Sequence, residues 1–211
     1  MHMPGRKRNA DAFPFLEGLG ASLDITEIEG ADALYSASGI IAQSQANASA
    51  LFGSGKTLYS CEGSSLSIRA MLYLALLCKD GSERPFILAG RNAHKALLSA
   101  AALLDFDIEW LYSETPGGIV SCHISADTLD KKLRDLERKP AAVYITSPDY
   151  LGNLADIGGM SEVCRKYGVL LIVDNAHGAY LHFLPKPEHP LDLGAEMCCD
   201  SAHKTLPVLT G

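Results

Sequence analysis

The chain has 211 residues, of which 47% are hydrophobic and 20% are charged, as is usual for a globular protein with an apolar core. Its formal net charge at pH 7 is −7, and its one basic cluster, Arg6-Lys7-Arg8, is short, which argues against nucleic acid as a main partner. The length suits one large domain, or one domain and part of another.

The cysteines and the apolar stretches bear on the cellular compartment. Six cysteines occur, and no two have the C-x-x-C spacing of a zinc or redox site, so we interpret them as small apolar residues in a reducing environment. The N-terminus lacks the apolar run of a signal peptide, and no stretch approaches 18 uninterrupted apolar residues. We therefore expect a cytoplasmic protein without a membrane span.

The first part of the chain predicts an arm followed by a helix. Residues 1–38 are interrupted by glycine and proline, whereas 40–52 read as a helix that Gly53 ends. Gly53-Ser54-Gly55-Lys56-Thr57 resembles the end of a phosphate-binding P-loop, but the first glycine of that motif would fall on Ala50. The segment also follows a helix rather than a strand, so we interpret it as a turn. The expected domains are an N-terminal arm, 1–38, and a large domain, 39–211.

Beyond this turn, short apolar segments alternate with longer helical ones. The expected strands are 57–60, 85–89, 108–112, 141–146, 169–173 and 197–199. The expected helices are 64–78, 93–104, 125–138 (capped by Ser125 or Asp127) and 157–167. This alternation predicts the α/β class, as a three-layer αβα sandwich with a mostly parallel, doubly wound sheet. Such sheets bind ligands beyond the carboxyl ends of their strands.

Small and polar residues follow the first expected strands. Gly63-Ser64-Ser65 opens a helix, where backbone N–H groups and the helix dipole favour a phosphate group, although this motif taken alone is better explained by Ser64 as an N-cap. His94, at the start of the next helix, is placed either to stack on a planar ring or to cap the helix at the surface. The hydroxyl of Ser147, after the fourth long strand, is a further candidate for contact with a ligand.

Charged residues follow the last two strands. Asp174 ends the most hydrophobic strand, where an unpaired carboxylate would be costly, so it requires a cation such as a protonated pyridine nitrogen. Lys204 follows the last strand. It is either a solvated loop lysine or a lysine that forms a Schiff base with a carbonyl compound such as pyridoxal phosphate.

Taken together, these motifs resemble those of the fold-type I pyridoxal-phosphate enzymes, and in detail those of the Orn/Lys/Arg decarboxylase family. The resemblance covers residues 2–211 and rests on motifs that occur in the family's order. They are Met3-Pro4-Gly5-x-Lys7, Asp24-Ile25-Thr26-Glu27, Gly63-Ser64-Ser65, Ala93-His94-Lys95, Asp174-x-Ala176-His177 and Ser201-x-His203-Lys204.

The resemblance implies a pyridoxal 5'-phosphate site and a role for each matching residue. Lys204 would carry the cofactor and Asp174 would pair with the ring nitrogen. His94 would stack on the ring, and His177, next to Ala176, would lie near the 3-hydroxyl. The implied phosphate ligands are Ser64, Ser65, Ser201 and His203, with Gly63 and Ser147 also lining the cofactor site. No metal is implied.

The chain departs from the family pattern in two motifs and in length. Arg6 stands where the family has histidine, and Asp149 where it usually has threonine; both changes concern the substrate rather than the cofactor. Family members continue for a few hundred residues past the lysine, whereas Gly211 ends this chain. We therefore expect a truncated chain or a fragment of a shorter form.

The implied activity is decarboxylation of arginine, lysine or ornithine to the amine and carbon dioxide, in a homodimer or larger homo-oligomer. Two alternatives remain at this point. The first is another reaction of the same fold, by an aminotransferase or lyase, which product analysis would distinguish. The second is a fragment that folds and associates but is inactive, because the neighbouring subunit and a C-terminal domain usually complete such sites.

Overall fold

The computed structural model describes residues 9, 11–25, 28–79, 83–115 and 120–208. The chain divides into two compact units, Met1–Tyr59 and Ser60–Gly211. The predicted boundary between an arm and a large domain at residue 38 stays a prediction. The motifs Met3-Pro4-Gly5-x-Lys7 and Asp24-Ile25-Thr26-Glu27, with Arg6, lie wholly or partly outside the described residues.

The first unit holds two short helices, α1 (Pro14–Glu17) and η1 (Ala21–Leu23), and the longer α2 (Ile40–Leu51). The carboxylate of Asp32 organises the entry to α2 by accepting four backbone N–H groups, from Ala33, Ser38, Gly39 and Ile41, at 2.8–3.1 Å. Although partial desolvation opposes them, these bonds lower the pKa of Asp32 to about 2. The cap is therefore charged at neutral pH.

The prediction of a turn at residues 53–57 agrees with the backbone, whereas the strand predicted at 57–60 is wrong. Gly53 has a φ of +61°, and the hydroxyls of Ser54 and Thr57 are 2.8 Å apart. Thr57 N–H donates to Ser49 Oγ at 2.7 Å, and the Tyr59 hydroxyl donates to the Ser44 carbonyl at 3.0 Å. These groups bond to α2, so the segment is not part of a sheet ladder.

The second unit is built on a sheet of five strands in the order β2-β1-β3-β4-β5. The strands are β1 (Phe86–Gly90), β2 (Asp107–Leu111), β3 (Ala142–Thr146), β4 (Leu170–Asp174) and β5 (Met197–Cys199). All four pairings are parallel, which agrees with the predicted doubly wound sheet. Parallel strands require crossovers, and the chain provides a helix for most of them.

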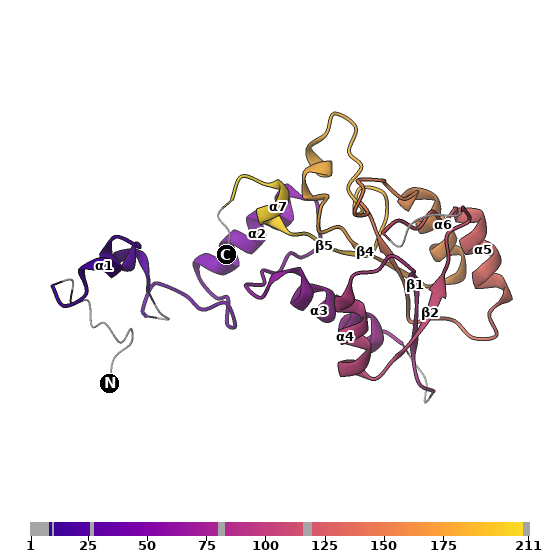
Figure 1. Ribbon diagram of the computed structural model, residues 1–211, viewed down its shortest axis with the longest axis horizontal. Helices are drawn as coiled ribbons and strands as arrows, with labels where there is room; N and C mark the ends of the chain where they lie inside the picture. Colours follow the sequence, from indigo (N-terminus) through magenta and orange to yellow (C-terminus); the bar gives the residue numbers. More distant parts are fainter. Residues whose placement is uncertain (1–8, 10, 26–27, 80–82, 116–119, 209–211) are drawn as a thin grey trace. The chain divides into compact units, whose positions relative to one another are not determined.

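Two helices cover each face of the sheet (Figure 1). α3 (Gly63–Leu77) and α4 (Lys95–Leu104) lie on one face, and α5 (Ala126–Asp135) and α6 (Ile157–Tyr167) on the other. Each face has its own apolar layer: Leu72 and Leu97 pack with Tyr144 and Ile172 on the first, and residues of α5 and α6 pack on the second. The three-layer αβα architecture is thus confirmed.

Helix ends follow the capping chemistry of the sequence. Ser125, rather than Asp127, caps α5 by accepting the Thr128 N–H at 3.1 Å, and Asp156 caps α6 through Gly159. Two further short elements, η2 (Ala179–Phe183) and α7 (Ala202–Thr205), follow β4 and β5. Among the described residues, none of the helices combines the length and the apolar character needed to span a bilayer.

Candidate active site

The carboxyl ends of β3, β4 and β5 lie side by side. Thr146 pairs with Asp174, and Asp174 with Cys199, in the parallel register of these strands. The loops that begin at Ser147, Asn175 and Asp200 therefore leave the sheet at one edge. This is the edge at which doubly wound sheets bind ligands.

Asp174 is a buried carboxylate, with 3% of the residue exposed. It accepts the Tyr144 hydroxyl at 3.0 Å and the Ala176 backbone N–H at 3.3 Å. Burial, followed by the negative charge of Asp174, raises the pKa of Tyr144 well above its usual value, so the tyrosine remains a donor. Two oxygens can accept about four hydrogen bonds, and these two contacts leave capacity for a cation.

Lys204, in α7, lies next to His177, which is on the loop that follows the neighbouring strand β4. Lys204 Nζ is 3.2 Å from His177 Nε2. An ammonium group has only donors, so His177 accepts at Nε2 and carries its proton at Nδ1. Burial and then the positive charge of Lys204 lower the pKa of His177, while Asp174 opposes them. Asp174, His177 and Lys204 thus form one electrostatically coupled group.

The residues predicted to hold phosphate lie at this same edge. Ser201 is buried, and its Oγ has no hydrogen-bond partner within the described part of the chain, although Ser201 is the N-cap residue of α7. At the start of α3, where Gly63 has a φ of +67°, no side chain caps the helix. The Cys199 thiol donates to the Ser64 carbonyl at 3.6 Å and so ties this helix end to the end of β5.

His94 and Ser147 have structural contacts of their own. His94 is exposed and caps α4, accepting the Ala96 N–H at Nδ1 at 3.2 Å, which is the capping geometry considered as the alternative to ring stacking. Ser147 is buried and accepts the Ala155 N–H at 3.1 Å; its hydroxyl proton remains available to a ligand. Ser65 is partly buried and His203 is exposed in α7. Their predicted contacts with a cofactor stay predictions.

The loop after β3 contains Asp149, one of the two departures from the family pattern. Its carboxylate accepts the backbone N–H groups of Leu151 and Asn153 and the Asn153 side-chain amide, at 2.8–2.9 Å. Burial raises the pKa of Asp149, but these hydrogen bonds outweigh it and the net pKa is lowered. Asp149 therefore organises its own loop, and the adjacent Tyr150 ring lies edge-on to His177 with centroids 6.1 Å apart.

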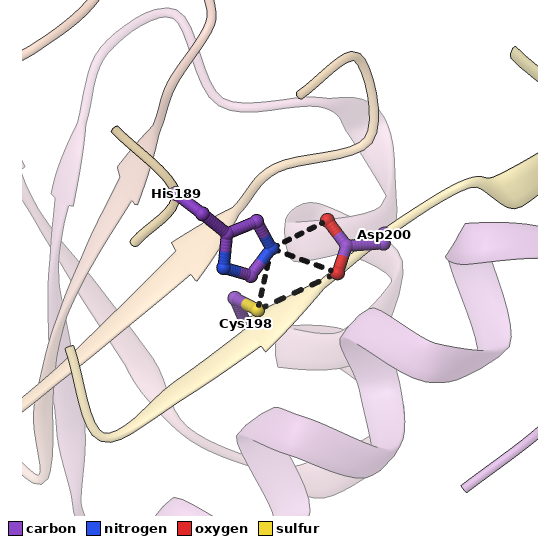
Figure 2. Close-up of side chains that lie close together, drawn as sticks. All are labelled: His189, Cys198 and Asp200. Atoms are coloured by element: carbon purple, nitrogen blue, oxygen red, sulfur yellow. Dashed lines mark hydrogen bonds and ion pairs between the residues drawn. The ribbon is translucent and has the colours of Figure 1, made fainter. Parts of the chain in front are cut away.

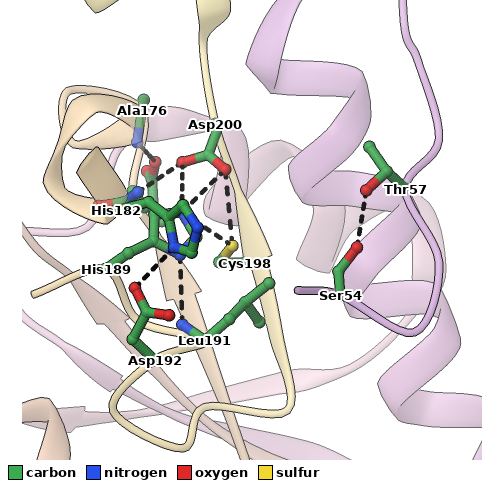
Figure 3. A network of polar contacts seen from close by, with 11 residues as sticks. Ser54, Thr57, Ala176, His182, His189, Leu191, Asp192, Cys198 and Asp200 are labelled. Carbon is green, nitrogen blue, oxygen red and sulfur yellow. Dashed lines mark hydrogen bonds and ion pairs between the residues drawn. The ribbon is translucent and has the colours of Figure 1, made fainter. Parts of the chain in front are cut away.

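Sequence reasoning missed three polar groups behind this edge. Tyr144 is fully buried and orients Asp174; a tyrosine within an otherwise apolar strand, two residues before the strand end, was the available signal. Asp200 accepts from the Asn175 side chain at 2.5 Å and from His189 Nε2 at 3.1 Å. Figure 2 shows Asp200 with His189 and Cys198, and Figure 3 shows the surrounding network. His189 lies in an irregular segment, which offered no signal.

The donor set fits pyridoxal phosphate. A buried carboxylate with spare acceptor capacity suits a protonated ring nitrogen, and a buried serine hydroxyl without a partner suits a phosphate oxygen. An uncapped N-terminus of a long helix favours the same dianion. Lys204 is exposed, and so its amine is accessible to an aldehyde.

Solved structures define the class of this fold. The chain superposes over its full length on 32% of E. coli constitutive lysine decarboxylase, with a TM-score of 0.72 and 18% identity. It also matches mouse CSAD with a TM-score of 0.63 and 20% identity, over 77% of this chain and 37% of that one. The fold is that of the fold-type I pyridoxal-phosphate-dependent enzymes.

Sequence comparisons then give the family. The model of the family "Orn/Lys/Arg decarboxylase, major domain" matches residues 12–211, and the chain belongs to this family. Its members are pyridoxal-phosphate-dependent amino acid decarboxylases. A Bacillus subtilis (strain 168) relative, "Uncharacterized protein YaaO", is 33% identical over 99% of this chain and 43% of its own length. Arginine decarboxylase of the same strain is 30% identical over 96% of this chain. The chain spans only 43% and 41% of these two relatives.

Proposed function

We propose that this chain forms the cofactor-binding part of a pyridoxal-phosphate-dependent decarboxylase that acts on arginine, lysine or ornithine. The observation that carries the proposal is the cluster of Asp174, His177 and Lys204 at one edge of the sheet, with Lys204 Nζ 3.2 Å from His177 Nε2. Similarity to arginine decarboxylases at about 30% identity supports a basic amino acid as the substrate. We place the protein in the cytoplasm as a homodimer or larger homo-oligomer.

The chemistry divides between the cofactor and the chain. Bound pyridoxal phosphate supplies an aldehyde that reacts with amines and a ring that accepts electrons from the bond to the departing carboxylate. Asp174, oriented by the Tyr144 hydroxyl, would hold a proton on the ring nitrogen and so keep the ring electron-poor. Ser201 and the N-terminus of α3, with Ser64 and Ser65, hold the phosphate group.

Two neighbouring groups move protons at the reacting centre. Lys204 would be the covalent attachment point of the cofactor, and its amine, when free, would exchange protons in the site. His177 is neutral at pH 7 because its pKa is lowered, and its Nε2 lone pair faces Lys204. It can take a proton from Lys204 and return it, which is the role of a general acid-base residue.

The covalent step is tested by mapping the modified lysine. The full chain is incubated with pyridoxal phosphate, its visible absorbance is recorded, and the adduct is reduced with borohydride, digested and located by mass spectrometry. We expect the label on Lys204 and its absence in Lys204→Met. Lys95→Met is the matched control, because Lys95 is an exposed lysine at the start of α4 near the same edge. A label on another lysine would refute the assignment.

The reaction is tested by its products. In a protein that carries this sequence and is active, arginine, lysine or ornithine should yield the amine and carbon dioxide in equal amounts. Asp174→Ala should lower kcat at least about a hundredfold, because the ring nitrogen loses its counter-charge. A keto acid in place of the amine would sink the decarboxylase assignment, and unaltered turnover in Asp174→Ala would contradict the role of that residue.

A further inference from the structure

Asp200 connects the two loops that carry the proposed catalytic residues. It directly precedes Ser201, at the carboxyl end of β5, and its Oδ1 accepts the side-chain amide of Asn175 at 2.5 Å. Asn175 directly follows Asp174 at the end of β4, is fully buried, and donates its backbone N–H to the Cys199 carbonyl at 3.0 Å. The segment 174–177, at the end of β4, is therefore bonded through a carboxylate to the segment 201–204, which follows β5.

His189 holds the second oxygen of this carboxylate. The imidazole is fully buried, and its Nε2 lies 3.1 Å from Asp200 Oδ2 and 3.3 Å from Oδ1 (Figure 2). The Cys198 thiol also faces Oδ2, at 3.7 Å. Asp200 thus has donors on both oxygens, and its rotamer is set by groups from two separate segments.

The protons in this cluster distinguish a hydrogen-bond network from a metal site. His189 Nε2, Cys198 Sγ and an Asp200 oxygen lie within 4.8 Å of one another, as three metal ligands would. However, His189 Nδ1 accepts the Leu191 backbone N–H at 3.4 Å, so the ring proton lies on Nε2 and points at Asp200. Burial and the nearby Asp200 charge raise the pKa of Cys198, which keeps its proton too. Two of the three ligand atoms are therefore protonated donors.

We propose that Asp200 is a positioning residue, which sets the distance and orientation between residues 174–177, at the end of β4, and residues 201–204, which follow β5 and include α7. The inference rests on the proposed function, because the geometry it fixes is that of the cofactor site. Asn175 and His189 are its two anchors. Asp200 acts through the residues beside it, Asn175 and His189.

Asp200→Asn is the sharpest variant, because it keeps the shape and reverses one hydrogen bond. The carboxylate accepts at both oxygens, whereas an amide offers one acceptor and one NH₂ donor. One of the two anchors, the Asn175 amide or His189 Nε2–H, must then face another donor. Asp192→Asn is the matched control: Asp192 pairs with His182 at 2.8 Å in the same part of the fold but belongs to neither loop (Figure 3).

The experiment compares the full-length wild type, Asp200→Asn and Asp192→Asn in three measurements. Pyridoxal phosphate affinity is expected to fall about ten- to hundredfold in Asp200→Asn, the loss typical of a hydrogen bond to a charged group. The pH at which the visible band of the lysine-bound cofactor titrates should also shift. Independently of the cofactor, ¹⁵N spectra of labelled histidine should show His189 as the Nε2–H tautomer in wild type. Asp192→Asn should match wild type in all three.

Each outcome decides between the two proposals. Wild-type affinity and titration in Asp200→Asn would overturn the positioning role while leaving the proposed function in place. A wild-type chain that takes up no cofactor on Lys204 would refute the proposed function, and the inference with it. A His189 tautomer other than Nε2–H, or stoichiometric uptake of Zn²⁺ alone that Asp200→Asn abolishes, would replace the network by a metal site. If Asp200→Asn does not fold, Asn175→Ala breaks the same link from the other loop and should also weaken cofactor binding; wild-type affinity there would overturn the role.

Discussion

The loop after β3 and the pair of loops after β4 and β5 use carboxylates in opposite ways. The carboxylate of Asp149, in the first, accepts hydrogen bonds from Leu151 and Asn153, within four residues of itself. Asp174 and Asp200, in the second region, accept from Tyr144, Asn175 and His189, which are 30, 25 and 11 residues away. Both regions lie at the carboxyl ends of neighbouring strands of the same sheet.

This difference separates a self-contained turn from a site assembled by the fold. The hydrogen bonds of Asp149 stabilise its own loop. The carboxylate of Asp174, by contrast, raises the pKa of His177, which contacts Lys204, and it retains acceptor capacity; Ser201 Oγ, after the neighbouring strand, has no partner among the described residues. A carboxylate whose hydrogen bonds are all made within its own loop stabilises that loop, whereas a buried polar group with unused hydrogen-bonding capacity can bind a ligand.

The largest expected change in stability comes from the hydroxyl that orients Asp174. Tyr144→Phe should lower the free energy of unfolding by roughly 1.5–3 kcal/mol, because a buried carboxylate loses a donor. Urea unfolding of the cofactor-free chain measures this. Tyr167→Phe is the matched control: that hydroxyl donates to the Asp130 carbonyl at 3.4 Å beside the solvent-exposed Lys166–Asp130 pair, and its removal should cost under about 1 kcal/mol. Equal losses in the two variants would contradict the distinct role of Tyr144.

A smaller change is expected in the self-contained loop. Asp149→Ala should cost roughly 1–2 kcal/mol, because two backbone N–H groups and one amide lose their acceptor within residues 149–153. Hydrogen exchange should become faster at Leu151 and Asn153 and stay unchanged at Asn175. Faster exchange at Asn175 would show that the two regions are coupled, contrary to the comparison.

The smallest effect concerns the titration of His177. The pKa of His177 in the folded chain lies below 6.5, so the unfolded chain takes up the proton first as the pH falls. Protonation of His177 therefore favours unfolding. The stability of the folded chain is not reduced by this effect above pH 6.5, and it decreases as the pH falls below that value. NMR titration should show a higher His177 pKa in Lys204→Met, still below 6.5 because burial remains. Asp174→Asn should lower it further, and Lys95→Met should leave it unchanged. An unaltered His177 pKa in Lys204→Met would contradict the contact.

Most of the fold could be predicted because its signals are local. The five strands and the long helices α3–α6 of the second unit appear within a few residues of their expected bounds, and α6 and β5 have the predicted bounds, 157–167 and 197–199, whereas the short η2 and α7 were not predicted. The strand predicted at 57–60 failed because a short segment with β-forming residues becomes a strand only if a neighbouring strand accepts its hydrogen bonds. Thr57 and Tyr59 instead bond to α2.

By itself, the sequence determined the order of the elements, the fold class and the family, since these depend on periodicity, caps and motifs that lie close together along the chain. It also identified the residues at the strand ends, because parallel strands bring those ends to one edge. Only the tertiary structure decided which of them interact. The bonds from Tyr144 to Asp174, from Asn175 and His189 to Asp200, and from Lys204 to His177 join segments brought together by strand register and burial. Such partners have no fixed spacing in the sequence, and so no motif encodes them.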